Sequence, residues 1–326
     1  MANILIRGQG VAAYGCARLL TAAGFRTALA ETGRPRIPAI LLGGTTQTLI
    51  RDVFGDHDWL RGQPQISKRV VAWGPRATPA TVPHFAVVVS EETLAERLRP
   101  QVPGTIEDGA DWTFYASRPL PADSAELCFG TRRAQAVSVE LTPNCDRMAC
   151  WIESLDHGWL FLIPGPGETG WLLAVGDPAG PLLEESRLVA RQIRCGSAAG
   201  SEFAVYPRII DPVCGPGWLS GGTAALAFDP LCGDGTGHAI REAILAAAVI
   251  RAASTGADVE SLLAHYRARL VAGFKRHLLA CREFYATGGT SEWWATELRM
   301  IEEGIAWCGQ ESAFRYQLRG FELQLV

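Results

Sequence analysis

The sequence has 326 residues, of which 48% are hydrophobic and 20% are charged, and its formal net charge is −4. This size and balance describe an ordinary globular protein that buries one large core or two linked ones. The acidic net charge and the scattered basic residues argue against nucleic-acid binding, and no apolar run reaches membrane-spanning length. The first residues read as a buried strand and not as a targeting signal, so we expect a cytoplasmic protein without a membrane segment.

The chain opens with a strand, a glycine turn, a helix and a second strand, predicted over residues 3–7, 8–10, 12–23 and 26–31. In such a unit Gly8 permits the tight turn, Gly10 lets the backbone approach a pyrophosphate, and Ala13 allows close packing of the helix on the strand. Glu31 closes the second strand, where a carboxylate accepts hydrogen bonds from a ribose diol and repels a 2′-phosphate. This order predicts a dinucleotide-binding unit.

Residues 32–46 form a Pro/Gly-rich passage that we expect to be a loop near the cofactor. Arg36 is a candidate phosphate ligand there, as is Arg34, and ordinary solvated arginines fit the pattern equally well. Beyond the loop we predict a helix at 47–54, strands at 69–73 and 84–89, a helix from the Ser90 cap to Leu98, and a strand at 112–116 that returns to the first sheet.

From Leu127 to Tyr206 the sequence changes to short β runs separated by turns, at 134–141, 148–154, 158–163 and 171–175. They predict an antiparallel sheet inserted into the nucleotide-binding part, followed by a helix near 183–195. A helix near 236–253 and a helical remainder with a short extended tail follow. The nine cysteines form no C-x-x-C pair, so we expect no metal site and no redox dithiol.

A second glycine-rich helix start follows the strand at Trp218. Residues 221–238 read Gly-Gly-Thr-Ala-Ala-Leu-Ala-Phe-Asp-Pro-Leu-Cys-Gly-Asp-Gly-Thr-Gly-His and lead into an alanine-rich helix. Two such starts, far apart in the sequence, suit FAD, a cofactor long enough to need both. The predicted fold class is α/β, a Rossmann-type FAD-binding domain with an interleaved antiparallel-sheet substrate domain and a helical C-terminal segment. The expected ranges are 1–65, 87–120 and 208–255 for the FAD-binding domain, 66–86 and 121–207 for the substrate domain, and 256–326 for the C-terminal segment.

This order of motifs resembles the FAD-dependent aromatic hydroxylases of the p-hydroxybenzoate hydroxylase type and their relatives, the flavin-dependent halogenases. The resemblance covers about residues 1–255. The C-terminal segment, with His277 and the Trp293-Trp294 pair, is more similar to smaller flavoproteins that assist the formation of protein-derived tryptophan quinones.

The resemblance implies a set of cofactor contacts in the second motif. Thr223 stands where the family has an acid that binds the ribityl chain, so a single hydroxyl replaces a carboxylate. Pro230 lies in the loop that faces the flavin ring. Backbone N–H groups of Gly233, Gly235 and Thr236 at the helix start would stabilise the negative charge of reduced flavin.

The resemblance implies hydroxylation of an electron-rich aromatic substrate, an indole or a phenol, through a flavin C4a-hydroperoxide. A peptide-borne tryptophan or a carrier-bound ring is possible because the chain is short for the family. Trp159, Phe161 and Ile163 share one strand face and are candidate substrate contacts, although such a face is more often core. A halogenase needs a suitably placed lysine, and Lys68 looks out of register with Trp73.

His238, Asp229 and His84 are the candidate acid–base residues, each with a structural role as the alternative. Asp229 could simply brace its loop. The region 112–118 lacks the second Asp-Gly segment of hydroxylases that accept NADPH directly, which favours a separate flavin reductase as partner. The alternatives are a halogenase, a flavin oxidoreductase, and a non-catalytic flavin-binding accessory subunit, the last encouraged by the missing ribityl acid.

Overall fold

A short, mostly parallel sheet organises one half of the fold, which we describe from a computed structural model covering residues 2–33, 36–55, 58–102, 109–196, 200–231, 234–309 and 315–325. Its strands lie in the order β15, β16, β6, β1, β2, and only the edge strand β15 is antiparallel to its neighbour. They are β1 (Asn3–Arg7), β2 (Arg26–Ala30), β6 (Trp112–Tyr115), β15 (Cys214–Gly215) and β16 (Trp218–Ser220). The predicted opening unit and the returning strand are confirmed.

Four helices accompany this sheet: α1 (Val11–Ala22), α2 (Gly44–Phe54), α3 (Glu91–Leu98) and α6 (Gly235–Ser254). Helices α1 and α6 pack closely, because a Cβ on Gly15 would already lie 2.8 Å from the side chain of Ile240. Small alanine side chains make most of α6 apolar on all sides, which is typical of a helix buried in a core. Ser90 caps α3 as predicted, accepting the Thr93 N–H at 3.0 Å.

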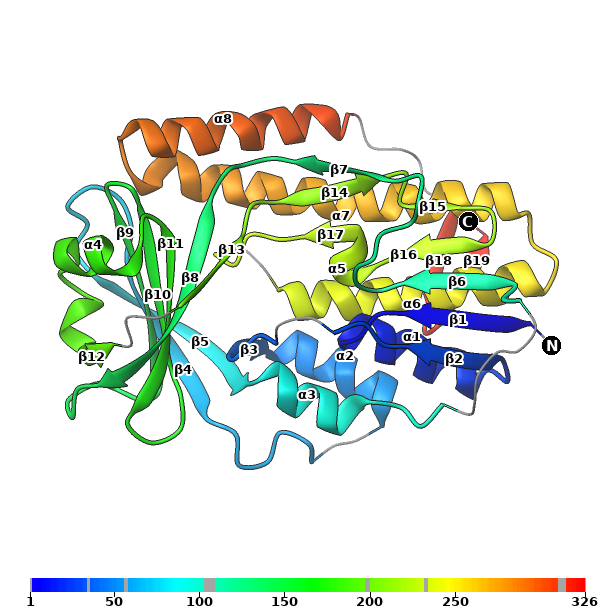
Figure 1. Ribbon diagram of the computed structural model, residues 1–326, viewed down its shortest axis with the longest axis horizontal. Helices are drawn as coiled ribbons and strands as arrows, with labels where there is room; N and C mark the ends of the chain where they lie inside the picture. The colour runs from blue at the N-terminus through cyan, green and yellow to red at the C-terminus, as the bar shows by residue number, and fades with distance from the viewer. Residues whose placement is uncertain are drawn as a thin grey trace.

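The other half of the fold is a nine-stranded sheet at the far end of the molecule (Figure 1). The order is β12, β8, β11, β10, β9, β4, β5, β3, with β13 also paired to β8, and only the β4–β9 pair is parallel. The strands are β3 (Ile40–Gly43), β4 (Gln65–Ala72), β5 (Ala80–Val89), β8 (Arg133–Leu141), β9 (Ala149–Leu155), β10 (Gly158–Pro164), β11 (Thr169–Gly176), β12 (Ile193–Gly196) and β13 (Ser201–Ala204). The predicted β runs are therefore strands of one sheet.

The two faces of the nine-stranded sheet bury different cores. On β10, Trp159, Phe161 and Ile163 belong to the main hydrophobic core, whereas Leu160 and Leu162 belong to a smaller core that includes residues of α4 (Ala179–Glu185). This alternation is the period of two that a strand imposes. We call the face that carries Trp159 the inner face of the sheet.

A helical hairpin, α7 (Val259–Gly288) and α8 (Glu292–Trp307), runs along one side of the molecule from the parallel sheet to the nine-stranded sheet (Figure 1). A three-stranded sheet lies beside it, formed by β7 (Ala125–Cys128), β14 (Arg208–Asp211) and β17 (Leu226–Ala227), with the short helix α5 (Gly222–Ala225) nearby. The chain ends in the hairpin of β18 (Tyr316–Arg319) and β19 (Glu322–Leu325). Within the described ranges, no helix combines the length and the apolarity needed to cross a membrane.

The predicted helix near 183–195 is wrong. Helix α4 ends at Glu185, a single 3₁₀ turn follows at Ala190–Gln192, and residues 193–196 form β12 against β8. The buried carboxylate of Glu153 accepts backbone N–H groups from Arg187, Leu188 and Val189, which a helix would pair with its own carbonyls. The predicted fold class is otherwise confirmed, while the exact domain boundaries stay a prediction.

Candidate functional site

The first glycine turn leaves the start of α1 without a side-chain cap. Gly8 and Gly10 have φ values of 112° and 90°, a region that favours glycine. A Cβ on Gly8 would lie 2.6 Å from the backbone nitrogen of Ser117, so the turn is pressed against the end of β6. Gly10, the N-cap residue of α1, has no side chain to bond the first N–H groups, which suits a helix start that binds an anion. Ala13 is fully buried in the core behind this turn.

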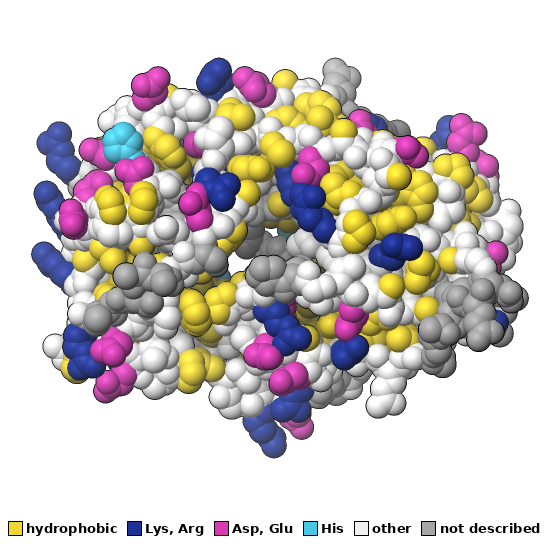
Figure 2. All heavy atoms as spheres, in the orientation of Figure 1, with side chains coloured by type: hydrophobic (Ala, Val, Ile, Leu, Met, Phe, Trp, Pro, Cys, Tyr) yellow, Lys and Arg dark blue, Asp and Glu magenta, His cyan; other side chains and the backbone are white. Residues whose placement is uncertain are grey.

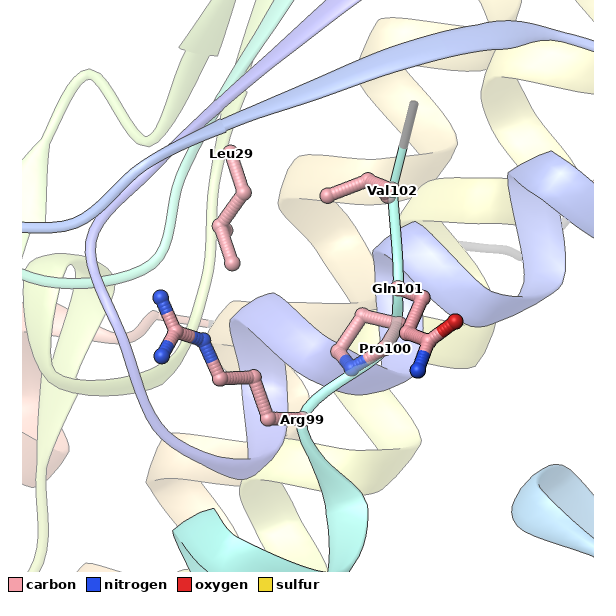
Figure 3. Close-up of a pocket in the computed structure, with 5 residues that line it drawn as sticks. All are labelled: Leu29, Arg99, Pro100, Gln101 and Val102. Carbon is pink, nitrogen blue, oxygen red and sulfur yellow. The ribbon is translucent and has the colours of Figure 1, made fainter. Parts of the chain in front are cut away.

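A pocket of about 520 Å³ opens beside the end of β2, lined by Leu29, Arg99, Pro100, Gln101 and Val102 (Figure 3). Glu31 lies next to it and accepts hydrogen bonds from the Tyr14 hydroxyl at 3.0 Å and from Arg99 at 2.7 Å. Burial and then the bond to Glu31 raise the pKa of Tyr14, which keeps this hydroxyl a donor. A carboxylate has about four lone-pair sites, so Glu31 retains acceptor capacity for a ligand.

The second glycine turn lies directly against the first unit. Gly221 follows β16 and donates its N–H to the Tyr115 carbonyl at 2.8 Å. Gly222 has a φ of 54°, and a Cβ there would lie 2.8 Å from both the Ala12 Cβ and the Ala116 carbonyl oxygen. The two turns, separated by most of the sequence, therefore meet at the start of α1.

Thr223 and Glu242 lie on opposite sides of this second turn. Thr223 is exposed, and its hydroxyl is 3.5 Å from the Ala116 carbonyl. Glu242 on α6 is buried and accepts the Gly222 N–H at 2.6 Å. Burial raises the pKa of Glu242 to about 8, so its carboxyl group is largely protonated at neutral pH. The turn thus has an exposed hydroxyl, which bonds the Ala116 carbonyl, and a mostly neutral, buried acid.

The start of α6 is capped by Asp234 and has an exposed glycine in its first turn. Asp234 caps the helix by accepting the Gly237 N–H at 3.0 Å, and it also accepts the Thr46 hydroxyl of α2 at 2.6 Å. Gly235 is exposed, and a Cβ there would meet no heavy atom within 4 Å. Thr236 follows it in the first turn, whereas Gly233 lies outside the described residues.

Asp229, just before Pro230, is the centre of a buried polar network. Its carboxylate accepts hydrogen bonds from Arg132 Nε at 2.7 Å and from the Tyr285 hydroxyl at 2.7 Å, and its backbone N–H donates to His277 Nε2 at 2.8 Å. The Tyr285 hydroxyl also accepts the Trp159 indole N–H at 3.1 Å. The carboxylate is thus held in place, which favours the bracing role over proton transfer.

Glu297 of α8 completes this network. It forms an ion pair with Arg132, and it accepts the Thr131 hydroxyl at 2.6 Å and the Thr131 N–H at 3.0 Å. The guanidinium of Arg132 also stacks over the Tyr285 ring, 4.4 Å from its centroid. The sequence analysis missed Arg132, Tyr285 and Glu297, because no local motif marks them.

The structure does not bring the three candidate acid–base residues together. His238 on α6 stacks on Phe228 with ring centroids 4.1 Å apart, and burial lowers its pKa to about 4. His84 lies inside β5 and not at the strand start, and its Nε2 is 3.1 Å from Arg69 Nη2. Their catalytic roles stay predictions.

The residues predicted to contact a phosphate and the substrate have protein neighbours in the structure. Arg36 forms an exposed ion pair with Glu92 of α3 at 2.9 Å, and Arg34 lies outside the described residues. Trp159, Phe161 and Ile163 are all buried in the main core. Their roles toward phosphate and substrate stay predictions.

The surface is hollowed between the two halves of the molecule, with hydrophobic side chains at the edges of the hollow (Figure 2). One half supplies the glycine turns and α6, and the other supplies the nine-stranded sheet.

No protein-family model matches the sequence, and no curated protein sequence matches it either. Solved structures do match. The peptidyl tryptophan dihydroxylase QhpG, essential for tryptophylquinone cofactor biogenesis, has a TM-score of 0.78 and 18% identity over 100% of this chain and 86% of its own. The flavin-dependent halogenase CmlS has a TM-score of 0.73 and 18% identity over 95% of this chain and 70% of its own. HpxO of Klebsiella pneumoniae, complexed with FAD, has a TM-score of 0.66 and 15% identity over 93% and 95%.

These likenesses confirm the predicted resemblance at the level of the fold. The chain has the fold that a flavin-dependent halogenase and a peptidyl tryptophan dihydroxylase share. The C-terminal hairpin is part of the likeness, since the QhpG match covers the whole chain.

Proposed function

We propose that this chain is an FAD-dependent monooxygenase that hydroxylates an electron-rich aromatic ring, an indole or a phenol. The observation that carries the proposal is the contact of the two glycine turns, where a Cβ on Gly222 would lie 2.8 Å from that of Ala12. Because of this contact the two glycine turns lie side by side, and each turn is suited to a different part of a long dinucleotide.

The residues around these turns fit FAD. The amides after Gly8 and Gly10 would bind the pyrophosphate, and Glu31 with the adjoining pocket would bind the adenosine ribose. The exposed hydroxyl of Thr223 would contact the ribityl chain in place of the family's acid. The flavin ring would lie against the Pro230 loop and the open start of α6 at Gly235 and Thr236.

When bound and reduced, FAD supplies the activation of dioxygen, of which one atom enters the ring and the other leaves as water. The chain's own residues have simpler tasks. The helix start of α6 stabilises negative charge, and the buried network at Asp229 holds the Pro230 loop. His238, whose low pKa keeps it neutral at pH 7, would accept a hydrogen bond more readily than a proton.

The comparison with QhpG supports a peptide-borne tryptophan as the substrate, because that protein acts on a peptidyl tryptophan and its structure matches the whole chain. Halogenation is the weaker candidate. Lys68 stands opposite Ala149 of the smaller core and pairs with Asp146 at 2.7 Å, so it lies on the face of the sheet away from the inner face. We also propose that a separate reductase reduces the flavin, given the lack of the second Asp-Gly segment.

The test combines binding and turnover. Purified protein is mixed with FAD, freed of excess cofactor and examined for a bound flavin spectrum. It is then supplied with a flavin reductase and its reductant NADH, dioxygen, chloride or bromide, and either phenol, free tryptophan or a tryptophan-containing peptide. We expect oxygen uptake and a product with added oxygen, greatest with the peptide. A protein that binds FAD but takes up no oxygen would support the flavin-binding accessory subunit, a protein that stays colourless would overturn the proposal, and halide incorporation would support the halogenase.

A further inference from the structure

Arg69 lies on the inner face of the nine-stranded sheet. In the parallel β4–β9 pair it stands opposite Cys150, and Val71 stands opposite Ile152. Cys150 and Ile152 both belong to the main core, so Arg69 shares their face. Its neighbour Lys68 alternates to the other face, where it pairs with Asp146.

The helical hairpin covers only part of this face. Trp73, just past the end of β4, contacts Phe284 of α7 and Trp294 of α8, with ring centroids 6.1 Å and 5.5 Å away. Val82 stands directly opposite Arg69 on β5, and its side chain is 44% exposed. The cover therefore ends between Trp73 and Arg69, where Val82 is exposed, whereas Ala86 and Val88 farther along β5 are buried in the main core.

Arg69 has no acidic partner in the part of the chain that the structure describes. Its Nη2 lies 3.1 Å from His84 Nε2, and its Nε is buried without a hydrogen-bond partner. Burial, and then the charge of Arg69, lower the pKa of His84, so the histidine is neutral and accepts a hydrogen bond from Nη2. Among the described residues, the guanidinium is thus faced by the neutral ring of His84 and the thiol of Cys150, and by no carboxylate.

We propose that Arg69, oriented by His84, is a carboxylate-binding subsite for the substrate. A guanidinium offers paired N–H donors that match the two oxygens of a carboxylate, and a half-buried site strengthens the pair. Val82 supplies an apolar contact beside it for an aromatic ring. This inference rests on the proposed function, since the inner face is where the substrate would meet the flavin. The carboxylate belongs either to a free aromatic acid or to an acidic residue or C-terminus next to a peptide's aromatic residue.

Calorimetric titration of the purified protein tests the subsite with indole-3-acetate and its neutral analogue indole-3-acetamide. We expect the acetate to bind roughly tenfold more tightly, in line with a charge-assisted hydrogen bond. Arg69→Gln should abolish this preference, and Arg69→Lys should retain part of it. Lys68→Gln is the matched control, because it removes the same charge one residue away on the opposite face, and it should leave the preference unchanged.

A second arm identifies the source of the carboxylate with two short peptides, Trp-Glu and Trp-Gln, each amidated at the C-terminus. A preference for the glutamate peptide larger than that for indole-3-acetate indicates a peptide carboxylate, and the reverse indicates a free acid. Equal binding of acid and amide in both arms, no binding of any probe, or an equal effect of Lys68→Gln overturns the proposal. These titrations need no turnover, so they test the subsite separately from the oxygenase. If the protein is a flavin-binding oxygenase but binds acid and amide equally, only the subsite is overturned. If a colourless protein prefers the acid, only the oxygenase is overturned.

Discussion

Arg132 Nε donates a hydrogen bond of 2.7 Å to Asp229, and both side chains are fully buried. Arg132 comes between β7 and β8, Asp229 precedes the Pro230 loop, and the third member, Glu297, belongs to α8. Burial alone would lower the pKa of Arg132. The neighbouring Tyr285, Asp229 and Glu297, in decreasing order of effect, raise this pKa above its ordinary value. The buried guanidinium of Arg132 thus connects Asp229, which precedes the Pro230 loop, to the C-terminal hairpin.

Replacement of Arg132 should be strongly destabilising. Arg132→Met leaves Asp229 and Glu297 buried without a cation, so we expect the free energy of unfolding to fall by about 3–5 kcal/mol. Arg133→Gln is the matched control, since this neighbour forms an exposed ion pair with Glu202 and should cost less than about 1 kcal/mol. Urea denaturation measures both. Similar losses for the two variants would contradict the structural role of the buried pair.

Gly222→Ala should impair FAD binding. The added Cβ meets the Ala116 carbonyl oxygen at 2.8 Å, and the φ of 54° is unfavourable for alanine, so the turn must move away from α1. We expect the dissociation constant for FAD, followed by flavin fluorescence, to rise at least about tenfold. Gly180→Ala is the control, because a Cβ there meets nothing within 4 Å. Unchanged affinity in a Gly222→Ala protein whose circular dichroism is native would count against this turn as a cofactor contact.

Replacement of Glu31 should weaken the binding of FAD but not that of FMN. Its carboxylate lies beside the pocket assigned to the adenosine, a part that FMN lacks. Glu31→Ala should weaken FAD binding about tenfold, the loss expected for hydrogen bonds to a charged group, and leave FMN binding unchanged. Parallel fluorescence titrations with the two flavins provide the measurement. Equal weakening for both would indicate that Glu31 acts on the fold and not on the ribose.

Glu242 should make stability depend on pH. Burial raises its pKa from 4.5 to about 8, so the folded chain keeps a proton that the unfolded chain loses. The contribution of this proton is fully present below pH 4.5 and is lost as the pH rises toward about 8, by up to ~1.4 kcal/mol per pH unit.

Glu242→Gln tests this expectation. The amide oxygen still accepts the Gly222 N–H, but the side chain no longer titrates, so the slope of unfolding free energy against pH should flatten between pH 5 and 8. Urea denaturation at several pH values gives the slope. Glu302→Gln on the exposed side of α8 should leave it unchanged. The same slope in wild type and Glu242→Gln would assign the pH dependence to other groups.

The sequence by itself determined what short-range chemistry decides. The strand, turn and helix around Gly8 and Gly10 follow from hydrophobic period and from backbone conformations that favour glycine, and the Ser90 cap follows from a side chain reaching its own next turn. The period of two on β10 correctly placed Trp159 and Phe161 on one face. The fold class followed because these local signals occur in an order that few topologies satisfy.

Only the tertiary structure decided which distant residues meet. Arg132 and Asp229 are paired across 97 residues, and Glu153 replaces a predicted helix with a loop by binding N–H groups more than 30 residues away. Neither contact has a periodic or local signature, because each depends on where the chain topology brings two side chains in the low-dielectric core. The surroundings of Arg69 have the same origin, since strand register places it opposite Cys150 and Val82, and no described acid pairs with it.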